Sequence, residues 1–103
     1  MSVLEEVLEE EYTRSMRLCR RIEAELSSLL KGSVRVRQIR GREYYYLNYR
    51  EGDAVKSDYI PAREVEAVRA QIARRKELVA ALKEQKHSCQ QIERALGRKP
   101  NVE

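Results

Sequence analysis

The sequence predicts a mostly helical α+β domain, in which two long helices are joined by a three-stranded antiparallel β-meander. Two observations predict this fold. Apolar residues recur every three or four positions in the first and last parts of the chain, whereas a central stretch alternates every second residue. With 103 residues and no internal repeat, we expect residues 1–103 to form a single domain.

Residues 2–31 are expected to form the first helix. Ser2 is suited to cap its start, with Glu5 at the capping-box position, and Gly32 after Lys31 is suited to end it. Alternating steps of four and three residues separate the inward-facing positions, as in a coiled coil. These heptad positions are Leu8, Tyr12, Ser15, Cys19, Ile22, Leu26 and Leu29.

Residues 33–60 are expected to form the meander. Valines and arginines alternate in the first strand, and the middle strand is rich in tyrosine, which suits a pleated surface. Turns are expected at Arg40-Gly41 and at Glu51-Gly52-Asp53. Two faces alternate along the middle strand: Tyr44, Tyr46 and Asn48 share one, and Tyr45, Leu47 and Tyr49 share the other.

Residues 61–96 are expected to form the second helix, starting at Pro61. A separate final helix starting near residues 87–88 is the alternative, because Ser88 could cap it. Gly97 and Pro100 end the helix and leave residues 97–103 as a tail. The apolar stripe, interrupted by Arg75 and by Gln85-Lys86, consists of Val65, Val68, Ile72, Val79, Leu82, Cys89, Ile92 and Leu96.

The two helices are expected to form an antiparallel, coiled-coil-like hairpin with the sheet at its closed end. Charge favours this pairing, because residues 1–30 carry a net charge of −3 and residues 61–103 a net charge of +4. Folding back would bring the glutamates at the start of the first helix close to Lys83 and Lys86. Each exposed ion pair contributes only about 0.2–1 kcal/mol, so the charges orient the helices more than they stabilise them.

Several classes of protein are excluded by the sequence. No apolar run approaches the roughly 20 residues that span a bilayer. The first residues are acidic, where a signal peptide has a basic region. Two cysteines, Cys19 and Cys89, do not make a disulfide framework. We therefore expect a soluble, cytoplasmic protein.

Catalytic motifs are not found in the sequence, which has no glycine-rich phosphate loop, GxSxG or HExxH. The single histidine, His87, lies two residues from Cys89, and side chains two apart on a helix face different directions. A metal site usually needs three or four ligands. We expect no enzymatic activity, no cofactor, no metal ion and no small-molecule substrate.

The end of the second helix suggests a protein interface. This helix is the longer of the two, so its last turns are expected to extend beyond the first helix and to leave Cys89, Ile92 and Leu96 uncovered. A second copy or a partner helix could cover them. The alternative is that these turns fold back on their own hairpin. The leading prediction is therefore an interaction or scaffold module, assembled as a homodimer.

The meander suggests a different function. Its cations are interleaved with tyrosines, as in surfaces that bind phosphates with basic side chains and bases with aromatic rings. The alternative prediction is thus an accessory protein that binds nucleic acid. The residues expected to bind are Arg35, Arg37, Arg40, Arg42, Tyr45, Tyr49, Arg50 and Lys56.

Several motifs occur in a fixed order between residues 26 and 96. Gly32-Ser33-Val34 comes first, followed by the string YYYL at residues 44–47, Arg50 and Gly52, and a YIP entry into the second helix at residues 59–61. This order resembles an uncharacterised family of short prokaryotic proteins, known only as a domain of unknown function. The resemblance implies a helix–meander–helix fold, and it brings no activity and no binding residues.

Overall fold

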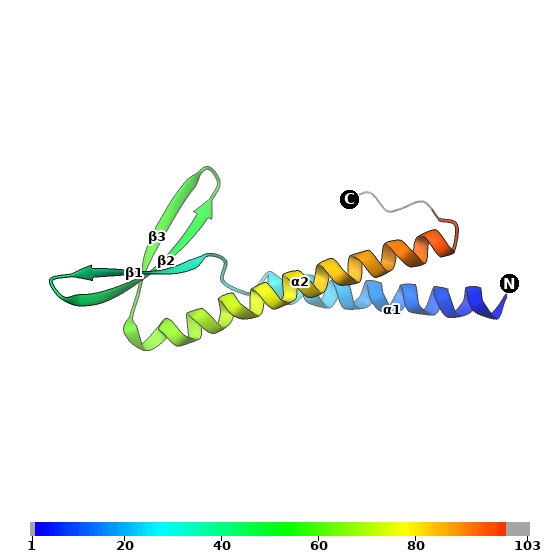
Figure 1. The fold of residues 1–103 in the computed structure, drawn as a ribbon, viewed down its shortest axis with the longest axis horizontal. Coiled ribbons are helices and arrows are strands. Elements are labelled where there is room, and N and C mark those ends of the chain that lie inside the picture. Colours follow the sequence, from blue (N-terminus) through cyan, green and yellow to red (C-terminus); the bar gives the residue numbers. More distant parts are fainter. Residues whose placement is uncertain (1, 99–103) are drawn as a thin grey trace. The chain divides into compact units, whose positions relative to one another are not determined.

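The structure is a computed structural model, and it describes residues 2–98 (Figure 1). These residues form two compact units, one from residues 2–28 with 78–98 and the other from residues 29–77. We call them the helical unit and the sheet unit. Helices α1 and α2 hold 24 and 31 of the 103 residues, so the protein is mostly helical, as predicted.

Helix α1 covers Val3–Leu26. Its start is as predicted, because the backbone N–H of Glu5 donates a hydrogen bond of 3.2 Å to the Ser2 side chain. Its end comes five residues earlier than the predicted Lys31. The hydroxyls of Ser27 and Ser28 donate to main-chain carbonyls three residues back, at 2.7 and 2.8 Å. Such local bonds compete with the helical pattern and favour its end.

The sheet consists of β1 (Ser33–Ile39), β2 (Arg42–Glu51) and β3 (Ala54–Ile60). The strands are antiparallel in the order β1-β2-β3, which confirms the predicted meander. Both connections are two-residue turns, because Ile39 pairs with Arg42 and Glu51 pairs with Ala54. The two hairpins share β2, and their turns point in different directions (Figure 1).

The second helical segment begins with a 3₁₀ turn, Ala62–Glu64, and continues as α2, Val65–Ala95. The alternative of a break near residues 87–88 is wrong, because α2 is continuous there. The backbone N–H of Gly97 donates to Arg94 and that of Arg98 donates to Glu93, a pattern that closes a helix end. Pro100 and most of the predicted tail lie outside the described residues.

The core of the sheet unit explains why α2 is longer than α1. Leu47 and Ile60 of the sheet pack with Val65 at the start of α2, and Val68 and Ile72 add to this cluster. The first turns of α2 are therefore used to cover the sheet. Only the part of α2 from Leu78 onward belongs to the helical unit.

The core of the helical unit follows the predicted heptad positions from Leu8 to Leu26, all of which are buried or half-buried. On α2 the predicted stripe is wrong at one position, because Leu78 is buried and Val79 is 50% exposed. Counting forward from Val65 in alternating steps of three and four residues reaches Val79. Counting back from Cys89 in alternating steps of four and three reaches Leu78 instead. The inward-facing positions of α2 are therefore offset by one residue between its first part, in the sheet unit, and its second part, in the helical unit. The prediction from Val65 assumed one uninterrupted series of such positions.

Burial of ionisable groups in the helical unit predicts alkaline destabilisation. Burial raises the pKa of the Cys89 thiol above its ordinary value of 9.0, and a hydrogen bond to Glu93 raises the pKa of the Tyr12 hydroxyl above 10.0. Both groups thus hold their protons more tightly in the folded chain than in the unfolded one. We expect the free energy of unfolding to fall as the pH rises through 9 and above, because the unfolded chain ionises first.

Urea unfolding at a series of pH values from about 7 to about 11 measures this effect. Cys89→Ala is expected to be less stable than the native chain at neutral pH and to lose less stability between neutral and alkaline pH. An equal alkaline loss in both proteins would contradict the assignment to Cys89.

Candidate nucleic-acid interface

The two faces of β2 have different surroundings. On one face Leu47 is only 8% exposed, and the neighbouring Tyr45 and Tyr49 pack with it against the core that includes Val65. We call this the covered face of the sheet. Residues paired across antiparallel strands lie on the same face, so the register extends the covered face to Val34 on β1 and Asp58 on β3.

The opposite face, which we call the open face, carries aromatic side chains. Tyr46 on β2 pairs with Tyr59 on β3, and their rings meet edge-to-face with centroids 5.9 Å apart. Tyr44 lies two residues from Tyr46 and shares its face. The ring of Tyr59 is in contact with solvent, since this residue is 58% exposed. Asn48 and Ser57 are paired beside the tyrosines and share a hydrogen bond of 2.7 Å.

Four arginines share the open face with these tyrosines. On β1, Arg35 pairs with Tyr46 and Arg37 pairs with Tyr44, while on β2 the alternation places Arg42 and Arg50 on the same side. The guanidinium of Arg37 lies 5.1 Å from the ring centre of Tyr46, a cation–π contact. All four arginines are exposed, and within residues 2–98 none of them forms an ion pair with a carboxylate.

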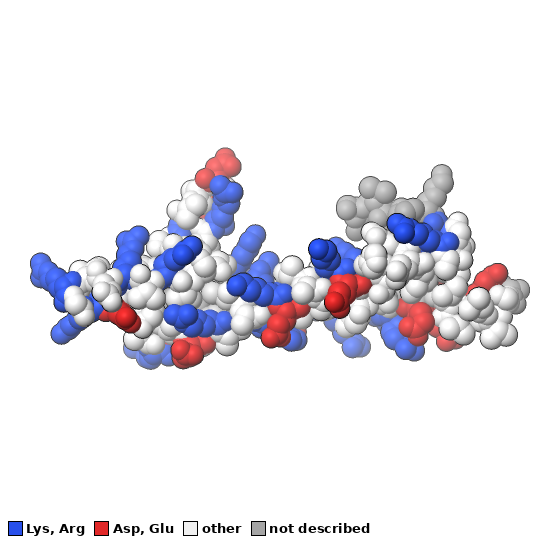
Figure 2. Space-filling model, in the orientation of Figure 1, with Lys and Arg blue, Asp and Glu red and all other residues white. Residues whose placement is uncertain are grey.

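The carboxylates of the strands lie on the covered face. Glu43 accepts a hydrogen bond of 3.1 Å from the Tyr45 hydroxyl, and this bond raises the pKa of Tyr45. A hydrogen bond to Asp58 likewise raises the pKa of Tyr49. Glu51 forms an ion pair of 2.9 Å with Lys56. The strands therefore keep their carboxylates on the covered face, whereas the open face carries four arginines beside tyrosine rings. Basic side chains also predominate over the sheet in Figure 2.

A comparison with protein-family models matches residues 6–70 to a domain of unknown function, DUF6788. The match covers more than half of the chain. The chain belongs to this family. The resemblance to a family of unknown function is thus confirmed, although the match starts and ends earlier than residues 26–96. Searches among curated proteins and among solved structures found no match.

The DUF6788 match includes the whole sheet, and four of the eight residues selected there from the sequence lie on its open face. Arg35, Arg37, Arg42 and Arg50 lie on the open face as a group. Tyr45 and Tyr49 instead lie on the covered face, where they pack against the core. Lys56 pairs with Tyr49 and shares that face, and Arg40 lies in the first turn.

The open-face tyrosines Tyr44, Tyr46 and Tyr59 were not selected from the sequence. The signal that identifies them is Leu47, the only aliphatic residue in β2. A leucine in a tyrosine-rich strand marks the side that faces the core. By alternation, the tyrosines at even positions of β2 must then face outward.

The residues predicted for an oligomer interface lie beyond the DUF6788 match, near the end of α2. They do not extend past α1 as expected. Cys89 is only 5% exposed, and Ile92 and Leu96 are half-buried. The extra length of α2 lies at its start, where Val65 packs on the sheet. Other apolar residues of the helical unit are exposed, namely Val3, Leu4, Val7 and Leu18 on α1 and Val79 on α2.

No other chemistry is evident in the part of the chain that the structure describes. Residues 2–98 contain no group of three His, Cys, Asp or Glu side chains that could hold a metal ion. None of their helices is long and apolar enough to cross a membrane. The open face of the sheet is therefore the candidate site for which the geometry is most specific.

Proposed function

We propose that this DUF6788 domain binds single-stranded nucleic acid through the open face of its sheet. The observation that carries the proposal is the separation of charge by face. Arg35, Arg37, Arg42 and Arg50 share this face with tyrosines, and within residues 2–98 none of the four forms an ion pair with a carboxylate. This arrangement favours nucleic-acid binding over a general scaffold role, because a surface that is only solvated has no need to keep acids away.

Single strands suit this surface better than duplexes. Arginines attract the phosphates, and tyrosine rings offer flat platforms on which unpaired bases can stack. In a duplex the base faces are already stacked on each other, and the short sheet has no helix to enter a groove. Stacking is tolerant of sequence, so we expect little base specificity.

Fluorescence anisotropy with labelled single-stranded DNA, single-stranded RNA and duplex DNA tests the proposal. At low salt we expect binding to both single strands and weaker binding to the duplex. The affinity should fall steeply with salt, because each neutralised phosphate releases counterions. Replacing Arg35, Arg37 and Arg42 together with Ala should lower the affinity at least tenfold and reduce the salt slope by about 2.

A matched control removes the same charge elsewhere. Arg20, Lys76 and Lys83 are exposed cations outside the sheet, and their triple Ala variant should bind nearly as well as the native chain. Tyr59→Leu should weaken binding roughly 5- to 100-fold and leave the salt slope unchanged, since stacking contributes about 1–3 kcal/mol per base. Equal losses in the two triple variants, or no binding at low salt, would contradict the proposal.

We also infer that α1 and the second half of α2 form an antiparallel, coiled-coil-like hairpin. Three contacts support this arrangement. Tyr12 donates a hydrogen bond to Glu93 at 2.9 Å, Glu23 lies 3.9 Å from Lys86, and Glu9 pairs with Arg98. The numbers of the partner residues, in α2 and just after its end, fall as the numbers on α1 rise, as they do between helices that run in opposite directions.

A further inference from the structure

The side of α1 that faces away from its buried residues carries exposed apolar side chains. Cys19 and Ile22 are buried in the helical unit. On other sides of the same helix Val3 is 76% exposed, Val7 48% and Leu18 38%. Positions 10, 14, 17 and 21 follow Val3 and Val7 at the same heptad spacing and therefore lie on the same side of the helix. We call this set the outer face of α1.

Charge on α1 is divided along its length. The first part is acidic, with Glu5, Glu6, Glu9, Glu10 and Glu11, and the next part is basic, with Arg14, Arg17, Arg20 and Arg21. Most of the outer-face charges have no partner of opposite sign. Within residues 2–98, Glu10, Arg17 and Arg21 form no ion pair, and Arg14 pairs only with its neighbour Glu11 at 3.1 Å.

Glu10 and Arg17, which have opposite charges, do not pair with each other within one helix. Glu10 and Arg17 are seven residues apart, which is about 10 Å along a helix. An ion pair needs a separation of about 4 Å or less between the charged atoms. A second helix lying against this face could offer each of them a partner of opposite sign.

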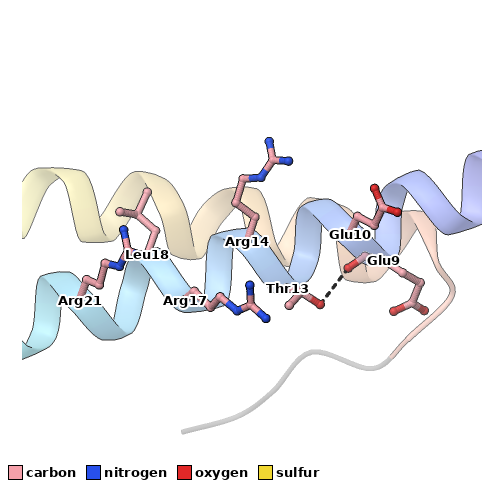
Figure 3. A pocket seen from close by; sticks show the side chains of 7 residues that line it. All are labelled: Glu9, Glu10, Thr13, Arg14, Arg17, Leu18 and Arg21. Carbon is pink, nitrogen blue, oxygen red and sulfur yellow. Dashed lines mark hydrogen bonds between the residues drawn. The ribbon is translucent and has the colours of Figure 1, made fainter.

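The outer face is also hollowed. Glu10, Arg14, Arg17, Leu18 and Arg21 line an open groove of about 630 Å³. Figure 3 shows Glu10, Arg14 and Leu18 extending to the same side of α1. Such a groove can receive the side chains of a second helix.

The geometry points to a second copy of this chain as the occupant, lying against the outer face of α1 in the opposite direction. A two-fold axis near residue 12 would set Glu10 opposite Arg14 of the second copy, Val7 opposite its Arg17 and Val3 opposite its Arg21. Every contact then occurs twice, as a two-fold interface requires. The acidic part of each helix meets the basic part of the other, and the arginine stems cover the valines.

The parallel arrangement is disfavoured by the same charges. It would place acidic residues against acidic ones and arginines against arginines, and like charges repel. The proposal does not depend on nucleic-acid binding, because no residue of the sheet takes part in it. Failure of one proposal therefore leaves the other unaffected.

Sedimentation equilibrium of the full chain, from micromolar to submillimolar concentration, tests the proposal. We expect a reversible dimer. Glu10→Arg should raise the dissociation constant tenfold or more, because it sets like charges against each other at two symmetric places. Combining it with Arg14→Glu should restore the dimer, since the pair is then reversed rather than lost.

Glu84→Arg is the matched control, because Glu84 is exposed on α2 and the change in charge is the same. It should leave the dissociation constant within about twofold of the native value, a difference of about 0.4 kcal/mol. Circular dichroism checks that each variant keeps its helicity. A native chain that stays monomeric, a dimer that Glu10→Arg does not weaken, or a double variant that stays dissociated would each overturn the proposal.

Discussion

Replacing Gly32 with alanine is expected to lower the free energy of unfolding by about 3 kcal/mol. Gly32 connects α1 to β1 with a φ of +137°, a conformation that side chains with a Cβ rarely adopt. A methyl group there would lie 2.3 Å from the main-chain carbonyl oxygen of Asn48. That oxygen cannot move freely, because Asn48 pairs with Ser33 in the sheet. The chain must therefore shift its backbone or separate the ends of two strands.

Gly41→Ala provides the matched control for this prediction. Gly41 also has a positive φ, of +79°, but nothing lies within 4 Å of the position that its Cβ would take. Only the backbone strain remains there, at about 1 kcal/mol. Urea unfolding followed by circular dichroism compares the two variants with the native chain. Equal losses of stability in both would show that the contact with Asn48 is not responsible.

The parts of the fold that could be predicted from the sequence depend on local signals. The heptad positions of α1 are buried as predicted because helical periodicity depends on the residues of one helix alone. The two-residue turns depend on Gly41 and Gly52 for the same reason. The end of α1 was missed because hydrogen bonds from Ser27 and Ser28 compete with a sequence that could continue as a helix.

The parts that could not be predicted depend on which element each segment packs against. One helix, α2, serves two cores, and the choice of Leu78 over Val79 follows from its partner rather than from its own sequence. The candidate site could be predicted in part. Its arginines follow from alternation in β1, whereas its tyrosines require the further step of recognising Leu47 as the core-facing residue of β2.

The burial of Glu93 could not be predicted at all, and it leads to the second large effect. Nothing in the sequence distinguishes this residue from the other acids, of which there are 17 in total, yet it is only 5% exposed. Its Oε1 accepts a hydrogen bond of 2.9 Å from the Tyr12 hydroxyl. Its Oε2 has no hydrogen-bond partner within residues 2–98. Within the described residues, Tyr12 is thus the one hydrogen-bond donor to a carboxylate that is removed from solvent.

Tyr12→Phe is therefore expected to lower the free energy of unfolding by about 2 kcal/mol, because a buried carboxylate loses its hydrogen-bond donor. Glu93→Leu alone should cost less, since the Tyr12 hydroxyl is only half-buried and can reach solvent. The double variant Tyr12→Phe/Glu93→Leu should be at least as stable as the native chain, because replacing both partners by apolar groups leaves no polar group unsatisfied.

Urea unfolding of the native chain, the two single variants and the double variant forms a double-mutant cycle, which isolates the energy of the pair. Tyr59→Phe serves as the control, because Tyr59 is 58% exposed and loss of its hydroxyl should change stability by less than about 0.5 kcal/mol. If the double variant is less stable than Tyr12→Phe alone, then Glu93 contributes to the fold through contacts other than its bond to Tyr12. If Tyr12→Phe behaves like Tyr59→Phe, then the Glu93 carboxylate is hydrated rather than buried between the helices.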